Sequence, residues 1–415
     1  MEQSIGIVGF DDPTFDPFAT SDMGHGWETV SDPYPAIARL RTEASVHQGG
    51  FREAFGAPAD ATLAHLPHFT LYGYDEISEA LLDSSRFSNT IYEHNIGKGF
   101  GRSITAMDAP EHTQYRRLFQ KAFLPKQITE WGDRDVVPVV QALIDKFADR
   151  GEAELVSEFT TSFPFHFIYR QLALPADDVE IFHALAVGLM CVTTDAVHGV
   201  EANRKLGDYF ERLLEHRRSQ PGDDLVSQLV LAQIDGERLP NDVIIAFLRQ
   251  LLNAGGDTTF RATGSTLAGL LADKDQLAAI RADRQLMPQA VAEGLRWEPP
   301  TTQLSRSPLR DVEMGGLHIP AGAALDIVVA SANRDPAQFE NPNQFDLFRA
   351  QKRNMTFGYG AHLCIGQFIA RLETQVAINA LLDRLPKLRL NDQMPAPQIA
   401  GLTKRSPDRI HVRFD

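Results

Sequence analysis

Cysteine is scarce in this chain of 415 residues, which contains only Cys191 and Cys364. Two cysteines so far apart provide no disulfide framework, and they suit the reducing cytoplasm in which we expect the protein to work. No Cys-x-x-Cys pair occurs, so the usual cysteine-based zinc motifs are absent. Each cysteine must therefore be explained by its own surroundings.

Long apolar runs and excess positive charge are also missing. No stretch of about 18 apolar residues occurs, so we expect no segment to span a membrane. The first residues, Met1 to Gly6, lack a basic region followed by an apolar run, so no signal peptide is predicted. Lys and Arg number 40 against 55 Asp and Glu, and the net charge of −15 argues against general binding to nucleic acids or anionic membranes.

The densest cluster of unusual residues runs from Phe357 to Gly366 and reads FGYGAHLCIG. Apolar residues follow it at helical spacing from Ile365 to Val376, so Cys364 is predicted where a glycine-rich loop enters a helix. The N–H groups and the dipole at a helix start favour a thiolate and lower a cysteine pKa. Glycines lack a Cβ and suit a backbone bent tightly beneath a large flat ligand.

Plainer interpretations of this cluster exist. A lone cysteine such as Cys364 is usually a small buried hydrophobic residue. Gly358 and Gly360 suggest a dinucleotide loop, but the third glycine stands six residues further on and no strand is expected before them. A zinc site through His362 and Cys364 lacks two further ligands.

The full spacing, Phe-Gly-x-Gly-x-His-x-Cys-x-Gly, resembles the haem-binding loop of the cytochrome P450 family. The resemblance implies that Cys364 is the proximal thiolate ligand of the iron in haem b. It also implies that Phe357, Gly358, His362 and Gly366 surround this cofactor.

A second cluster, Met107 to His112, precedes a helical pattern that continues through Phe123. His112 and Arg116 are four residues apart and share a helix face. A solvated basic face is the plainer interpretation, whereas two such groups also suit a carboxylate. The run Asp-x-Pro-Glu-His-x-x-x-Arg resembles the family's segment that grips a haem propionate, and by the same resemblance Arg306 is a further propionate ligand.

Asn241 is the predicted N-cap of a long helix that ends near Ala272. At 1.5 Å per residue it spans roughly 45 Å. Its middle, residues 253–259, reads NAGGDTT, and each glycine costs about 1 kcal/mol against alanine in a helix. A kink explains such a stretch, but we favour a loosened groove where water approaches the backbone. The stretch resembles the family's acid–alcohol pair, which implies that Asp257 and Thr258 are catalytic residues on the distal side of the haem.

The same helix provides candidate pocket residues. Ala254 lies four residues before Thr258 and is expected against the cofactor. The resemblance also predicts a hairpin tip near the C-terminus that reaches the substrate. The side-chain amides of Gln250 and Asn253 need hydrogen-bond partners, which are either water and backbone groups or an oxygenated substrate. The predicted substrate pocket comprises Gln250, Asn253, Thr302, Leu402 and Thr403.

Glu293 and Arg296 form an i,i+3 pair, which is commonplace on helices. In order and spacing the pair resembles the family's Glu-x-x-Arg, whose third member would be Arg349. We expect the three side chains to form a buried charge network with a structural role.

The resemblance predicts that the whole chain, residues 1–415, forms a single haem-thiolate monooxygenase domain. Residues 1–30 are expected to form an irregular lead-in, and residues 88–101 to form a long mobile loop. Residues 182–190 resemble the family's variable lid over the substrate. The resemblance implies a mainly α fold with a small β-rich subdomain, the triangular prism of the soluble bacterial cytochromes P450.

The function implied is insertion of one oxygen atom from O2 into a small-to-medium, mostly apolar organic substrate, by hydroxylation or oxidative dealkylation. We expect a monomer that receives electrons from a separate ferredoxin and its ferredoxin reductase, because no flavin or nicotinamide domain is fused. A peroxide-driven peroxygenase and a non-catalytic haem-thiolate gas or redox sensor are the alternatives, and neither needs the acid–alcohol pair. A basic dock for the ferredoxin is predicted from Arg117, Lys121, Lys126, Lys352 and Arg353.

Overall fold

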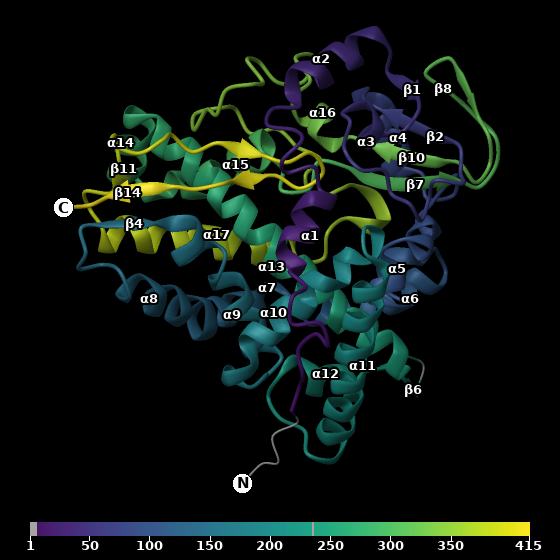
Figure 1. Ribbon diagram of the computed structural model, residues 1–415, viewed down its shortest axis with the longest axis horizontal. Coiled ribbons are helices and arrows are strands. Elements are labelled where there is room, and N and C mark those ends of the chain that lie inside the picture. The colour runs from purple at the N-terminus through teal and green to yellow at the C-terminus, as the bar shows by residue number, and fades with distance from the viewer. Residues whose placement is uncertain (1–5, 235) are drawn as a thin grey trace.

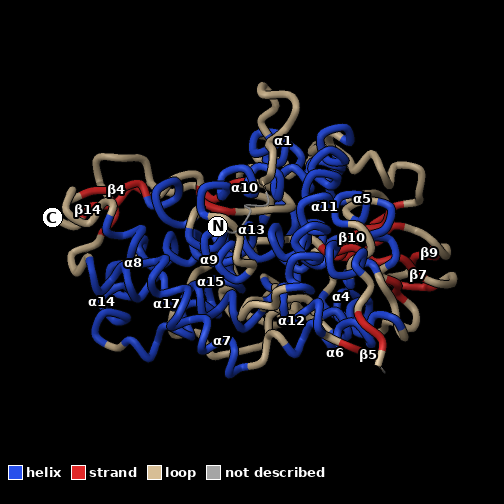
Figure 2. The backbone as a smooth tube through the Cα atoms, turned by 90° about the horizontal axis from the view of Figure 1, so that it is seen from below, coloured by secondary structure: helices blue, strands red, loops and turns tan. Residues whose placement is uncertain are grey.

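A computed structural model describes residues 6–234 and 236–415 of the chain. Helices dominate, and the outline in Figure 1 is roughly triangular. The strands of the largest sheet gather at one end of the molecule, as Figure 2 shows. This confirms the predicted mainly helical architecture with a small β-rich part. None of the helices among these residues is both long and apolar enough to cross a membrane.

The helices are, in chain order, α1 (Pro17–Gly24), α2 (Tyr34–Glu43), α3 (Phe51–Ala54), α4 (Tyr74–Leu82), α5 (Gly97–Phe100), α6 (Glu111–Lys121), α7 (Pro125–Trp131), α8 (Val137–Asp145), α9 (Phe163–Gln171), α10 (Val179–Gly188), α11 (Ala196–Ser219), α12 (Leu225–Leu231), α13 (Asn241–Ala272), α14 (Lys274–Ala282), α15 (Met287–Trp297), α16 (Val329–Asn333) and α17 (Gln367–Arg384).

The strands are β1 (Val46–Gln48), β2 (His68–Leu71), β3 (Phe87–Ser88), β4 (Glu152–Glu154), β5 (Gln233–Ile234), β6 (Glu237–Arg238), β7 (Leu304–Pro308), β8 (Val312–Met314), β9 (Leu317–Ile319), β10 (Ala324–Ile327), β11 (Arg389–Leu390), β12 (Ile399–Ala400), β13 (Ser406–Pro407) and β14 (His411–Arg413). The largest sheet has the order β1-β2-β10-β7-β3, in which only β2 and β10 are parallel. A smaller sheet joins β11, β14 and β4. Between β12 and β13 lies the hairpin tip that was predicted near the C-terminus.

Helix α13 crosses the centre of the molecule and packs against α9, α11, α15 and α17. It confirms the predicted long helix, and most of its side chains are buried. The predicted N-cap is wrong, because Pro240 occupies that position and Asn241 is the first helical residue. The Asn241 amide instead donates to Glu211 Oε1 of α11 at 2.6 Å.

The adjacent glycines of α13 are explained by packing. A Cβ on Gly255 would lie 2.7 Å from Ile168 Cδ1, and one on Gly256 would lie 2.4 Å from the Phe165 ring. Both neighbours belong to α9, so the glycines allow the two helices to approach closely. Because α13 is helical without a break from end to end, the prediction of a loosened stretch is wrong.

Two segments predicted to be irregular contain secondary structure. In the lead-in, residues 1–5 lie outside the described part, but α1 follows them because Asp16 accepts from Phe18 N and Ala19 N, and a proline at the first helical position suits a helix start. Residues 88–101 contain a short 3₁₀ turn and α5 rather than one long loop. Helix α6 ends two residues before Phe123, earlier than predicted.

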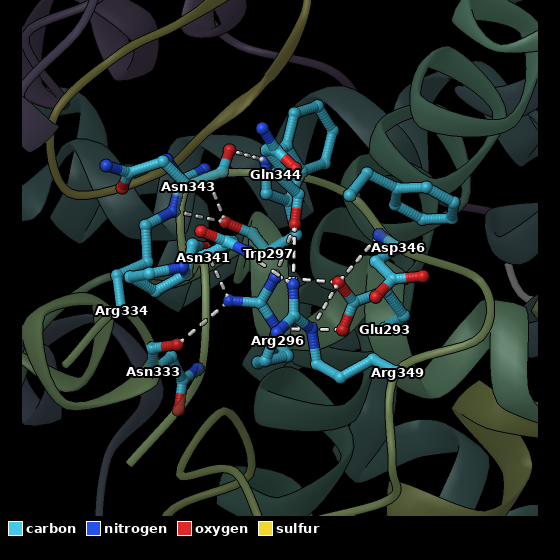
Figure 3. Close-up of polar contacts among 12 residues, drawn as sticks. Glu293, Arg296, Trp297, Asn333, Arg334, Asn341, Asn343, Gln344, Asp346 and Arg349 are labelled. Atoms are coloured by element: carbon cyan, nitrogen blue, oxygen red, sulfur yellow. Dashed lines mark hydrogen bonds and ion pairs between the residues drawn. The ribbon is translucent and has the colours of Figure 1, made fainter. Parts of the chain in front are cut away.

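The predicted charge network is present (Figure 3), with Glu293 and Arg296 buried and Arg349 partly buried. Arg296 grips Glu293 with two parallel bonds of 2.7 Å, from Nε to Oε2 and from Nη2 to Oε1. Arg349 Nε donates to Glu293 Oε1 at 3.0 Å. Arg296 Nη1 also donates to the carbonyls of Asn333 and Pro342, at 3.1 and 2.7 Å. The network therefore ties α15 to α16 and to the chain that leads into the loop of Cys364.

We predict that Glu293→Ala lowers the free energy of unfolding by about 3–5 kcal/mol, because it leaves two arginines without their buried partner. Urea denaturation monitored by circular dichroism measures this. The control is Glu43→Ala, which removes a half-exposed partner of Arg39 on α2 and should leave the midpoint almost unchanged. Equal midpoints for the two variants would contradict the structural role of the network.

Candidate active site

A cavity of about 290 Å³ lies between α13 and the loop that precedes α17. Its walls come from parts of the chain that are far apart in sequence. It brings together every residue predicted to contact the cofactor, namely Cys364, His112, Arg116, Arg306, His362, Phe357, Gly358, Gly366 and Ala254. We call it the inner cavity.

The loop of Cys364 is held by its own backbone. Cys364 N donates to Phe357 O at 2.9 Å, and Gly366 is the N-cap residue of α17. Gly360 has φ +72°, and a Cβ there would lie 2.6 Å from Leu81 O, so this turn requires glycine. The loop therefore presents the thiol to the inner cavity just before the helix begins, as predicted.

The predicted lowering of the Cys364 pKa is wrong for the protein alone. Burial raises the pKa of this thiol and outweighs the Gly366 backbone N–H and the Arg116 charge, which lower it. A metal cation reverses such a balance, because a coordinating thiol is deprotonated outright. The site thus suits a thiolate only when a cation lies against the sulfur.

Two histidine rings lie beside each other at the wall of the inner cavity, with the centroids of His112 and His362 3.9 Å apart. Burial lowers the pKa of His112 to about 4 and also lowers that of His362. Both rings are therefore neutral at pH 7. His112 Nε2 is buried and has no hydrogen-bond partner among the residues that the structure describes.

Two arginines complete this wall. Arg116 Nη2 donates to the carbonyl of Leu363, and Arg306 Nη1 donates to the carbonyl of Ser305 at 2.8 Å. Within residues 6–234 and 236–415, neither guanidinium forms an ion pair with a carboxylate. Burial lowers the pKa of both, and a buried cation without a partner is costly.

These observations test whether haem fits. An orphaned imidazole nitrogen and two unpaired guanidinium groups match the carboxylates of a porphyrin. Phe357, Leu304 and Ile369 supply apolar surface to the same cavity. The residues present therefore fit a large flat group that carries carboxylates on one edge and takes a thiolate ligand.

The acid–alcohol pair is divided between two sides of α13. Thr258 lines the inner cavity, and its Oγ1 donates to Ala254 O at 2.6 Å. Asp257 lines a separate cavity of about 620 Å³ instead. There it pairs with Arg261 Nε and with Lys404 Nζ, each at 2.9 Å. The expectation that both side chains face the cofactor is therefore wrong for Asp257.

An outer cavity of about 310 Å³ adjoins the inner one. The two share wall residues that include Gln250 and Thr258. Asn253 and Thr403 line it as predicted. Thr302 and Leu402 do not line either cavity, because Thr302 Oγ1 donates to Leu402 O at 2.6 Å and both residues are fully buried behind the wall. Thr301 lines both cavities in their place.

The pocket amides differ in their partners. Asn253 Nδ2 donates to the carbonyl of Ala186 in α10, at 3.3 Å. Gln250 Nε2 donates to Thr105 Oγ1, and its Oε1 is buried with no partner among the residues described. A backbone carbonyl thus satisfies the amide of Asn253, whereas the side-chain oxygen of Gln250 is buried without a donor among the residues described.

Sequence reasoning missed Glu373, which belongs to α17 and lines the inner cavity. Its side chain is buried, its Oε1 has no partner within the described chain, and burial raises its pKa well above the usual range. Burial therefore favours the neutral form of this carboxyl group. The available indication was an acidic residue within the buried helix face that carries Ile369 and Ala377.

Comparison with known proteins gives concordant matches. The cytochrome P450 family model matches residues 176–410. Cytochrome P450 monooxygenase PikC of Streptomyces venezuelae is 32% identical over 397 residues, which is 92% of each chain. Cytochrome P450-terp of a Pseudomonas species is 30% identical over 404 residues, 92% of this chain and 93% of that protein. The crystal structure of CYP109E1 from Bacillus megaterium in complex with testosterone superposes with a TM-score of 0.81 at 26% identity, over 92% of this chain and 99% of that one.

We predict that Cys364→Ser abolishes the thiolate-type Soret band of the reduced carbon-monoxide complex. The control is Cys191→Ser, because Cys191 is buried, lines none of the three cavities and has a pKa that burial raises to about 12. This control should keep the band. The measurement is the absorption spectrum of each reduced variant with carbon monoxide. A thiolate-type band that survives in Cys364→Ser would contradict the ligand assignment.

Proposed function

Because the chain belongs to the cytochrome P450 family of haem-thiolate monooxygenases, we propose that it hydroxylates or oxidatively dealkylates a small-to-medium organic substrate with a mostly apolar body. The observation that carries the proposal is the pair of adjoining cavities, with the Cys364 thiol in one wall and Thr258 in another. A thiol that can ligate iron and a hydroxyl that can accept a hydrogen bond from water thus line the same space.

Members of the family bind haem b, and the residues around the inner cavity suit it. Cys364 Sγ would ligate the iron, and His112, Arg116 and Arg306 would hold the two carboxylates. When bound, haem supplies the iron centre at which dioxygen is activated with electrons from a partner. The protein's own contribution is to position this group, to exclude bulk water and to deliver protons.

Thr258 and Asp257 are proposed to deliver those protons. Because the Thr258 hydroxyl donates to Ala254 O, its oxygen remains able to accept a hydrogen bond from water. Burial disfavours the charged form of Asp257, but Arg261 and Lys404 outweigh it and hold the pKa of this carboxyl well below its usual range. A carboxylate paired in this way holds no proton of its own. We expect that, when one ion pair opens, the freed oxygen accepts a proton from water and passes it on.

The proposed electron donor is a separate ferredoxin that docks near the loop of Cys364. Arg116 bonds the carbonyl next to Cys364, which places α6 against this loop. Arg117 and Lys121 are exposed on α6, and Lys352 and Arg353 are exposed just before the loop. Exposed cations on an otherwise acidic chain favour an acidic partner.

We predict that Thr258→Ala diverts most of the oxygen consumed to hydrogen peroxide and leaves substrate binding nearly unchanged, because the bound water loses its anchor. Asp257→Asn should slow turnover by about 10²-fold, a size typical of a lost acid–base group. Oxygen uptake, peroxide and product are measured with a generic ferredoxin and its reductase. Thr266→Ala is the control, because Thr266 makes the same bond to the residue four before it on α13 but lines none of the cavities.

The same assay separates the alternatives. Turnover with added peroxide but none with O2 and electrons would identify a peroxygenase, and neither activity would favour a sensor. Unchanged coupling in Thr258→Ala, or unchanged turnover in Asp257→Asn, would contradict the proposed proton delivery.

We predict that Lys121→Glu lowers the rate of electron transfer from an acidic ferredoxin several-fold and reduces its salt dependence. Salt screens such attraction over a Debye length of about 8 Å at physiological ionic strength. Lys274→Glu on α14 is the matched control, since α14 lies at the other end of the molecule from α6 in Figures 1 and 2. Stopped-flow reduction at several salt concentrations measures the effect. Equal rates in both variants would refute the dock.

A further inference from the structure

The connection between β1 and β2 is far longer than its geometry requires. The two strands are antiparallel neighbours, and β1 ends at Gln48 while β2 begins at His68, which leaves residues 49–67 between them. A tight hairpin needs only about two to five loop residues. Several members of this connection, including Gly50, Arg52 and Leu63, line the outer cavity. Apart from the single turn of α3 (Phe51–Ala54), the connection is irregular, and long irregular segments inside a compact domain are usually functional or disordered.

Arg52 lies in this connection with part of its guanidinium unused. Nη1 donates to the carbonyl of Gly24 at 2.6 Å and to that of Pro58 at 3.4 Å. Nε and Nη2 donate to no residue that the structure describes, and Arg52 forms no ion pair within that part of the chain. Nε and Nη2 form the edge of a guanidinium whose two parallel N–H groups match the oxygens of a carboxylate.

Three carboxyl groups, those of Glu53, Asp60 and Asp326, line the outer cavity with Arg52, and two of them accept hydrogen bonds from other residues. Asp326 Oδ2 accepts from Phe51 N at 2.8 Å, and its Oδ1 accepts from the amide of Gln303. Asp60 accepts from Thr62 and, at 3.3 Å, from Asn95. Asp326 and Asp60 are therefore held by these hydrogen bonds, and within the described residues neither forms an ion pair with Arg52.

The charge and the burial of Arg52 also bear on what it can bind. Burial lowers the pKa of Arg52, and the nearby carboxyls of Asp60 and Asp326 raise it in part. An arginine remains protonated in proteins, so Arg52 adds a positive charge to the wall of the outer cavity. The other cation of the outer cavity, Lys404, is already paired with Asp257 at 2.9 Å. Among the charged groups that line the outer cavity, Arg52 is thus the one with an open site for an anion.

We propose that Arg52 determines specificity by anchoring a carboxylate of the substrate through Nε and Nη2. Arg52 lines only the outer cavity and Cys364 only the inner one. The substrate therefore extends from a carboxylate at Arg52 to an apolar part beside Thr258, and oxidation falls on a carbon distant from the carboxylate. This inference rests on the monooxygenase function proposed above and adds the class of substrate, an apolar carboxylic acid.

The test uses the haem-loaded protein and a panel of alkyl and aryl carboxylic acids, each paired with its methyl ester. Binding is followed at pH 7 by the shift of the Soret band. Variants are Arg52→Gln, which removes the charge, and Arg52→Lys, which keeps the charge but loses the bidentate edge. Arg39→Gln is the control, because Arg39 is exposed and pairs only with Glu43 on the surface.

We expect the parent protein to bind the acids more tightly than their esters. Arg52→Gln should weaken acid binding at least tenfold, about 1.4 kcal/mol, and leave ester binding unchanged, with Arg52→Lys intermediate and Arg39→Gln like the parent. Equal losses for acid and ester, or no preference for any acid in the parent, would overturn the assignment. The reduced carbon-monoxide spectrum of each variant is recorded in parallel, so that loss of the thiolate site is distinguished from loss of the anchor.

Discussion

An unbalanced set of buried donors organises this molecule. His112 and Arg116 on α6 and Arg306 on β7 face the inner cavity, and neither arginine forms an ion pair with a carboxylate of the described residues. Such an arrangement is unfavourable in an isolated fold, and it becomes favourable when an anionic group occupies the cavity. Arg116 also donates to the carbonyl of Leu363. The side chain that we expect to bind a haem carboxylate therefore also positions the loop of Cys364.

Helix α13 then separates two chemical environments. Thr258 faces the inner cavity, whereas Asp257, the next residue before it, faces the larger cavity across the helix with Arg261 and Lys404. Lys404 lines the outer cavity as well, so one side chain contacts both the acid and the space proposed for substrate. The proposed proton supply and the proposed substrate space are therefore adjacent without sharing a cavity, and the close contact of Gly256 with α9 keeps the helix between them in place.

The charge network at Glu293 has a different role, because it lines neither the inner nor the outer cavity. It fixes the chain before the loop of Cys364 through Arg349 and through backbone carbonyls that Arg296 contacts. The thiol is thus supported from two sides, by this network and by α6. Substrate selection is left to long connections such as residues 49–67, which can vary without disturbing either support.

The sequence by itself determined the local chemistry: short-range spacing sets the shared face of His112 and Arg116, the Glu293–Arg296 pair and the long helix. The roles of Cys364 and of Arg349, which lies 56 residues from Glu293, came from the resemblance to the family. The structure decided which residues meet across the fold. Arg52 and Gly24, or Asp257 and Lys404, join segments that no local pattern connects. The predicted places of Thr302 and Leu402 in the pocket were wrong, because these two residues bond each other behind the wall. Their sequence neighbours Thr301 and Thr403 line the cavities instead. The pKa of Cys364 moved against expectation because burial, a property of the packed whole, outweighed the helix start.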